Sequence, residues 1–143
     1  MKSAERNSKM KWRYLIAFIA AISMAKPVFA GFDEGIAAYK KNDYAVALLE
    51  LKPLATAGNP TAQSFLGFMF ANGHGVQQDF KEAVKWFRLS AAQGDADAQL
   101  KLGVSYHSGE GVPQDYKEAV KWFRLAAAQG GAIAQFVLGV RLN

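Results

Sequence analysis

Apolar side chains between residues 60 and 92 form two stripes, each with the spacing of an α-helix. In the first stripe they fall at positions i, i+3, i+4, i+7 and i+8: Ala62, Phe65, Leu66, Met69 and Phe70. In the second stripe they again recur three or four residues apart: Phe80, Ala83, Val84, Phe87 and Ala91. A helix has this spacing when one of its faces is buried. The pattern therefore predicts a pair of amphipathic helices joined by a loop.

Capping residues mark the ends of this predicted helix pair. Asn59 before Pro60 supplies an N-cap and a first residue whose φ is already helical. Asp79, with Glu82 three residues later, has the pattern of a capping box for the second helix. Gly94 has no Cβ, and we expect it to end that helix in the left-handed conformation.

The loop between the helices contains two glycines and a valine. Its sequence is Gly73-His74-Gly75-Val76, and a similar run occurs at residues 109–112. The glycines suit positive φ values, and the valine can pack beneath the helix pair. Phosphate-binding loops also contain Gly-x-Gly, but no strand precedes this one, and neither a third glycine nor their lysine follows. A structural role is therefore predicted.

The helix pair belongs to an internal repeat of 36 residues. Residues 62–97 match residues 98–133 at 23 of 36 positions, and the pattern continues through residues 134–140. A weaker copy precedes them, with a shorter turn at Asn42-Asp43. Pro53 falls inside the second helix of that copy, where it should bend the helix or remove a backbone hydrogen bond.

The repeated residues resemble the Sel1-like repeat, a relative of the tetratricopeptide repeat (TPR). In the first full copy they are Ala62, Gln63, Leu66, Gly67, Gly73, Gly75, Val76, Gln78, Asp79, Phe80, Ala83, Trp86, Phe87, Ala91, Ala92 and Gly94. They recur from Ala98 to Gly130. The resemblance implies an all-α fold, an α/α solenoid of TPR-like helix-turn-helix repeats with about three helix pairs and a terminal helix. Its units are a degenerate repeat at 31–58, repeats at 59–94 and 95–130, and a partial repeat at 131–143.

The resemblance also implies a function. One helix pair cannot bury its apolar face alone, so neighbours stack, and the concave surface of such a stack usually binds proteins or peptides. We therefore expect a non-catalytic adaptor or scaffold that binds a protein or peptide partner on its concave face.

Differences between the two full copies suggest where that partner binds. Eight of the 13 differing positions lie between residues 64 and 74, in the first helix and its loop. First helices line the concave face in TPR-type stacks, which predicts a partner surface that includes Phe68, Asn72, Lys101, Ser105 and His107. The alternative is drift after duplication, or adaptation to unlike neighbours at the two ends of the stack.

Two tryptophans recur one period apart. Trp86 and Trp122 could form an aromatic platform for a sugar or peptide. Because the repeat pattern places tryptophan there, packing against the adjoining repeat is the better interpretation.

Residues 1–30 have the layout of a cleavable signal peptide. A basic stretch ends at Arg13, residues 14–25 carry no charge, and Val28 and Ala30 occupy the positions read by a signal peptidase. We expect cleavage between Ala30 and Gly31 and a periplasmic or secreted bacterial protein. The uncharged run is short for a membrane span of about 20 residues. An uncleaved anchor is the alternative, and no lipobox cysteine indicates a lipid anchor.

The net charge of +5 comes entirely from this leader. Residues 1–30 contain six basic residues and one acid, whereas residues 31–143 contain 11 of each. A domain with no net charge is not expected to bind nucleic acid. We expect contact with a membrane only through the signal peptide.

Candidate catalytic chemistry is scarce. The chain has no cysteine, and His74 and His107 are neither four residues apart nor near enough carboxylates for a zinc site, so we expect both to be solvated. No serine lies in a nucleophile motif. We expect no enzyme activity, no catalytic residue, no metal and no cofactor. Peptidoglycan or β-lactam chemistry is kept as the alternative function.

The last predicted helix, Ala134 to Asn143, is apolar on more than one side. Its only charge is Arg141, although terminal repeats normally present a polar outer face. Weak self-association or partner docking is one expectation, and a fraying cap or a shortened array is the other.

Overall fold

The computed structural model describes residues 5–9, 11, 13 and 28–141, and the chain divides into two units, Met1–Gly31 and Phe32–Asn143. The uncharged run of the predicted signal peptide lies outside the described residues. Ala30 and Gly31 fall in the first turn of helix α2 (Val28–Lys40). None of the described helices is long and apolar enough to cross a membrane.

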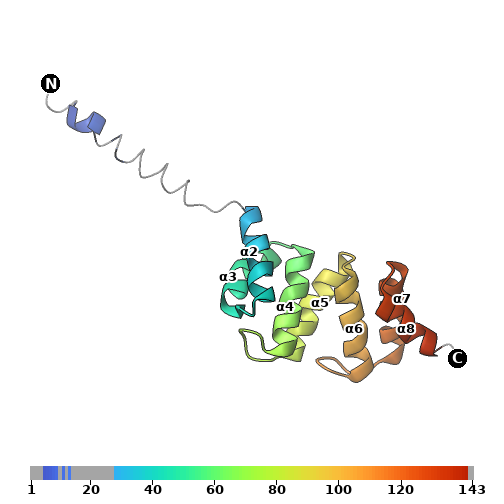
Figure 1. Ribbon diagram of the computed structural model, residues 1–143. Helices are drawn as coiled ribbons and strands as arrows, with labels where there is room; N and C mark the ends of the chain where they lie inside the picture. Colours follow the sequence, from blue (N-terminus) through green and yellow to red (C-terminus); the bar gives the residue numbers. More distant parts are fainter. Residues whose placement is uncertain (1–4, 10, 12, 14–27, 142–143) are drawn as a thin grey trace. The chain divides into compact units, whose positions relative to one another are not determined.

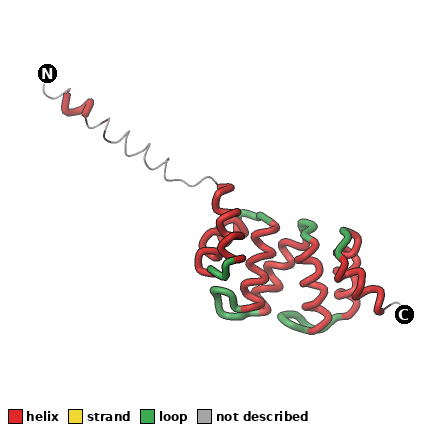
Figure 2. Tube along the Cα trace, viewed as in Figure 1, coloured by secondary structure: helices red, strands yellow, loops and turns green. Residues whose placement is uncertain are grey.

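The second unit is a row of helices, and its described residues contain no strand (Figures 1 and 2). After α2 come α3 (Tyr44–Thr56), α4 (Pro60–Asn72), α5 (Phe80–Ala92), α6 (Ala96–Ser108), α7 (Tyr116–Ala128) and α8 (Ala132–Arg141). From α3 onward each helix packs against the next, and α4 also contacts α6. The predicted all-α solenoid is confirmed, with α4–α5 and α6–α7 as its two full repeats.

The predicted N-caps at Asn59 and Asp79 are present, but the predicted capping box at Asp79 and Glu82 is not. Asn59 Oδ1 accepts from the Ala62 amide at 2.9 Å, and Asp79 Oδ1 accepts from the Glu82 amide at 3.0 Å. The amide of Asp79 donates to the Phe70 carbonyl at 2.9 Å, so it does not need the Glu82 carboxylate. Glu82 instead forms an ion pair with Lys85 at 2.8 Å. The predicted hydrogen bond from the Asp79 amide to the Glu82 carboxylate is therefore wrong.

The loop glycines have the predicted positive φ, and one of them has a second role. Gly73 and Gly75 have φ of +69° and +71°. A Cβ on Gly75 would lie 2.9 Å from Cβ of Tyr44, at the start of the second helix of the preceding repeat. A Cβ on Gly111 would lie 2.2 Å from the carbonyl oxygen of Phe80. The second glycine thus brings each loop against the previous repeat.

Pro53 does not end the helix that contains it. Helix α3 runs from Tyr44 to Thr56 through Pro53, whose side chain is exposed. Because proline has no amide hydrogen, the carbonyl of Leu49 loses its usual helical donor. The short turn predicted before this helix is present, with Asn42 at φ +62°.

Two clusters of buried side chains form the core. The first joins α2, α3 and α4, and Trp86 of α5 packs against it. The second joins α5 and α6, and Trp122 of α7 packs against it. Each tryptophan therefore packs against a cluster that its own repeat shares with the preceding one, which supports the packing interpretation.

Candidate functional site

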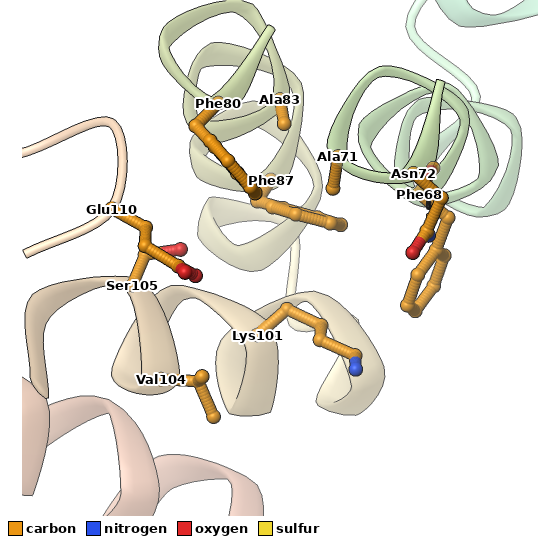
Figure 3. Close-up of a pocket in the computed structure, with 10 residues that line it drawn as sticks. All are labelled: Phe68, Ala71, Asn72, Phe80, Ala83, Phe87, Lys101, Val104, Ser105 and Glu110. Carbon is orange, nitrogen blue, oxygen red and sulfur yellow. Dashed lines mark hydrogen bonds between the residues drawn. The ribbon is translucent and has the colours of Figure 1, made fainter. Parts of the chain in front are cut away.

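A groove of about 160 Å³ lies between α4, α5 and α6 (Figure 3). Four of the five residues predicted to bind a partner line it. Phe68 and Asn72 come from α4, and Lys101 and Ser105 come from α6. The groove is completed by Phe80, Ala83 and Phe87 of α5, by Ala71 and Val104, and by Glu110 from the loop after α6.

Phe68 and Lys101 approach each other from neighbouring repeats. The Lys101 Nζ atom lies 5.3 Å from the centroid of the Phe68 ring, within the range of a cation–π interaction. The Phe68 ring also meets Phe87 edge to face, with centroids 5.3 Å apart. These contacts hold an aromatic ring and an ammonium group side by side in the groove.

The remaining polar groups of the groove carry both signs of charge. Glu110 adds a carboxylate to the ammonium group of Lys101. Asn72 Nδ2 donates to the carbonyl of Phe68 at 2.8 Å, so this donor is already used within α4. Among the described residues no group donates to the side-chain oxygen of Asn72, and Ser105 adds a hydroxyl group to the groove.

His107 is not one of the residues that line this groove. It lies in the last turn of α6, and its ring meets Tyr116 edge to face with centroids 5.3 Å apart. The structure therefore separates it from the other four predicted residues.

His74 is not solvated as the sequence suggested. Its ring stacks on Tyr44 with centroids 4.2 Å apart and planes 9° apart, and Nδ1 lies 3.2 Å from the Tyr39 hydroxyl. Burial, followed by the nearby Tyr44, raises the pKa of Tyr39 above its ordinary value. The prediction failed because Tyr39 and Tyr44 come from the preceding repeat. Through these two contacts, His74 packs its loop against the first repeat.

The described residues contain no group of three or more His, Asp or Glu side chains that could hold a metal ion. The groove itself contributes a single carboxylate, that of Glu110. Its lining is suited to recognising a ligand by shape, aromatic contact and hydrogen bonds.

Comparing the two copies detected only part of the groove. Glu110 is the counterpart of His74 one period later, and this position differs between the two copies. Sequence divergence could therefore have identified Glu110. On the α5 side, Phe80 differs from its counterpart Tyr116, but Ala83 and Phe87 are identical to their counterparts 36 residues later, so the comparison gave no signal for these two residues.

Comparison with protein families identifies two copies of the Sel1 repeat, at residues 60–95 and 96–131. A Sel1 repeat protein from Oxalobacter formigenes is 39% identical with a TM-score of 0.71, over 74% of this chain and 44% of that protein. A protective antigen of uropathogenic Escherichia coli with an SLR fold is 36% identical with a TM-score of 0.69, over 80% of this chain and 25% of that one. This chain thus spans less than half the length of either protein.

A more distant structure shares the fold. Cysteine-rich protein B of Helicobacter pylori is 22% identical with a TM-score of 0.61, over 77% of this chain and 93% of that protein. No curated protein matches the chain. Proteins with Sel1 repeats generally mediate protein–protein interactions and act as non-catalytic scaffolds. Because it contains two full Sel1 repeats and is 39% and 36% identical to the first two of these proteins, the chain belongs to the Sel1 repeat family.

Proposed function

We propose that the protein is an exported, non-catalytic adaptor that binds a protein or peptide partner in the groove between α4, α5 and α6. The observation that carries the proposal is the gathering of Phe68, Asn72, Lys101 and Ser105, four residues from divergent repeat positions, in one groove. First helices supply these residues, and in TPR-type stacks they line the concave face that receives partners.

The size of the groove favours a protein partner over a small molecule. Pockets for small ligands and cofactors usually enclose about 300–1,000 Å³, whereas this groove holds about 160 Å³. That volume suits one or two anchoring side chains of a larger partner, because binding energy at protein interfaces is concentrated in a few such anchors.

The test uses variants of Phe68 and Lys101, each changed to alanine, in pull-downs from bacterial envelope fractions. Wild-type domain 31–143 should enrich a protein that both variants lose. Lys117→Ala is the matched control, because Lys117 is exposed on α7 and is not part of the groove. His107→Ala tests the predicted residue outside the groove. Thermal melts of all variants should show that folding is intact. The proposal is wrong if both groove variants retain the partner.

The same experiment addresses the cell-wall alternative. Enriched glycan, or turnover of a chromogenic β-lactam by the purified domain, would support that alternative. Among the described residues of the groove, Ser105 has the only hydroxyl, and no hydrogen bond joins it to Lys101 or Glu110 as a nucleophile–base pair would require.

Export is part of the proposal and rests on the leader sequence. Protein recovered from the periplasm or medium should begin at Gly31 when its N-terminus is sequenced. Recovery of chain that still begins at Met1 from the cytosol alone would contradict export.

A further inference from the structure

The exposed sides of the second helices of the repeats, α3, α5 and α7, carry positive charge. Every charged side chain that is exposed on these three helices is basic: Lys52, Lys81, Lys85, Arg88, Lys117, Lys121 and Arg124. Residues one period apart occupy the same position in stacked repeats, so Lys52, Arg88 and Arg124 form one row along the stack. The domain has no net charge, but its charges are distributed unevenly.

The acidic residues beside these helices are already engaged. Asp79 Oδ1 accepts from the Glu82 amide at 3.0 Å, and the Glu82 carboxylate pairs with Lys85 at 2.8 Å. The same arrangement recurs one period later, at the start of α7. In the part of the chain that the structure describes, Lys81 and Lys117 form no ion pair. Their charges are therefore available to a partner.

Large apolar side chains are exposed on the same three helices. Leu49 of α3 is 70% exposed, and Leu89 of α5 and Leu125 of α7 are 51% and 49% exposed. At the two positions where α5 and α7 have their ion pairs, α3 has Val46 and Leu49 instead. The surface thus combines leucines with basic groups, and α3 is its most apolar part.

Neighbouring helices leave this surface open. Helix α5 packs against both α4 and α6, and yet its Lys85, Arg88 and Leu89 stay exposed. The counterparts of these residues on α7 are exposed as well. The exposure is therefore a property of the repeat and does not depend on where the chain begins or ends.

We propose that the exposed sides of α3, α5 and α7 bind the surface of a bilayer that contains anionic lipids. The basic residues contact the headgroups, and Leu49, Leu89 and Leu125 enter the boundary between headgroups and acyl chains. Lysine and arginine suit this arrangement, because their long apolar stems can lie beside the leucines while their charges stay in water. The proposal replaces the expectation, drawn from the net charge, that only the signal peptide contacts a membrane.

The residue types favour a bilayer over a protein or a nucleic acid. Five of the seven exposed basic residues are lysines, and lysine is depleted at protein–protein interfaces. A nucleic acid would be bound through the positive charges, because phosphate groups supply most of its affinity. A bilayer uses both the charges and the exposed leucines.

The test measures co-sedimentation of domain 31–143 with lipid vesicles. The leader is removed because it is itself basic and apolar, and residues 32–143 form a separate unit that contains both buried clusters. We expect at least tenfold tighter binding to vesicles of phosphatidylglycerol than to vesicles of phosphatidylcholine. Equal affinity for the two lipids, or no binding to either, would overturn the proposal.

A pair of charge variants tests the basic residues. Lys81→Glu should weaken binding to phosphatidylglycerol at least fivefold. Lys101→Glu is the matched control, because it changes the net charge equally but lies on the first helix α6, and it should bind vesicles as wild type does. Since Lys101 belongs to the groove proposed above, loss of the protein partner and loss of vesicle binding should come from different variants.

A second pair of variants tests the leucines. Leu49→Ser combined with Leu89→Ser should weaken vesicle binding at least tenfold, whereas Val104→Ser combined with Ile133→Ser, on exposed positions of first helices, should not. Thermal melts should show that all variants are folded. Wild-type affinity of either Lys81→Glu or the leucine variant would overturn the proposal, which requires both attraction and insertion. Equal affinity of wild type for a double-stranded DNA oligonucleotide and for the phosphatidylglycerol vesicles would assign the surface to polyanions in general and also overturn it.

Discussion

At the scale of single residues, the same substitution should have opposite effects in two helices. Gly103→Ala places a Cβ 2.6 Å from the ring of Phe123, and such overpacking costs about 1–3 kcal/mol. Gly139→Ala meets no described atom within 4 Å and should raise the free energy of unfolding by about 0.5–1 kcal/mol. Urea denaturation of both variants measures the difference. Equal effects of the two substitutions would show that the packing of Phe123 does not require glycine at position 103.

Single-residue features differ in how far the sequence can predict them. The caps at Asn59 and Asp79 and the positive φ of Gly73 were predictable because each depends on residues within one turn. The close packing of the Phe87 ring on Gly67 was not predictable, because the two residues are 20 positions apart in the sequence. The stacking of His74 on Tyr44 also depends on a distant contact, across two repeats.

At the scale of a helix, α3 contains a residue that lowers its stability. Pro53 removes the donor for the Leu49 carbonyl, a defect that costs up to about 3 kcal/mol inside a helix. Pro53→Ala should therefore raise the melting temperature, with a gain of about 1 kcal/mol or more in the free energy of unfolding. Lys52→Ala, at the adjacent exposed position, is the control and should change stability little. A lower melting temperature for Pro53→Ala would show that proline stabilises this helix.

Whole helices were more predictable than the groove that they form. The period of 36 residues and the apolar stripes predicted the pairs α4–α5 and α6–α7, because each stripe reports burial of one face. The groove depends on three helices, and most of the repeat divergence lies in α4, α6 and their loops, whereas the α5 side differs only at Phe80. Phe87 of α5 was missed because it is buried in the second cluster and is identical to its counterpart Phe123, so divergence could not reveal it.

At the scale of the whole repeat unit, stability should vary along the stack. In a linear array each helix is stabilised by its immediate neighbours. Helix α6 packs against α5 and α7 and also contacts α4, whereas among the described helices α8 packs against α7. Local unfolding should therefore begin at α8, where few contacts must break.

Hydrogen exchange measured by mass spectrometry tests this gradient. Amides of α8 should exchange at least tenfold faster than those of α6, because opening α8 leaves the two buried clusters intact. Protection of α8 equal to that of α6 would contradict the gradient.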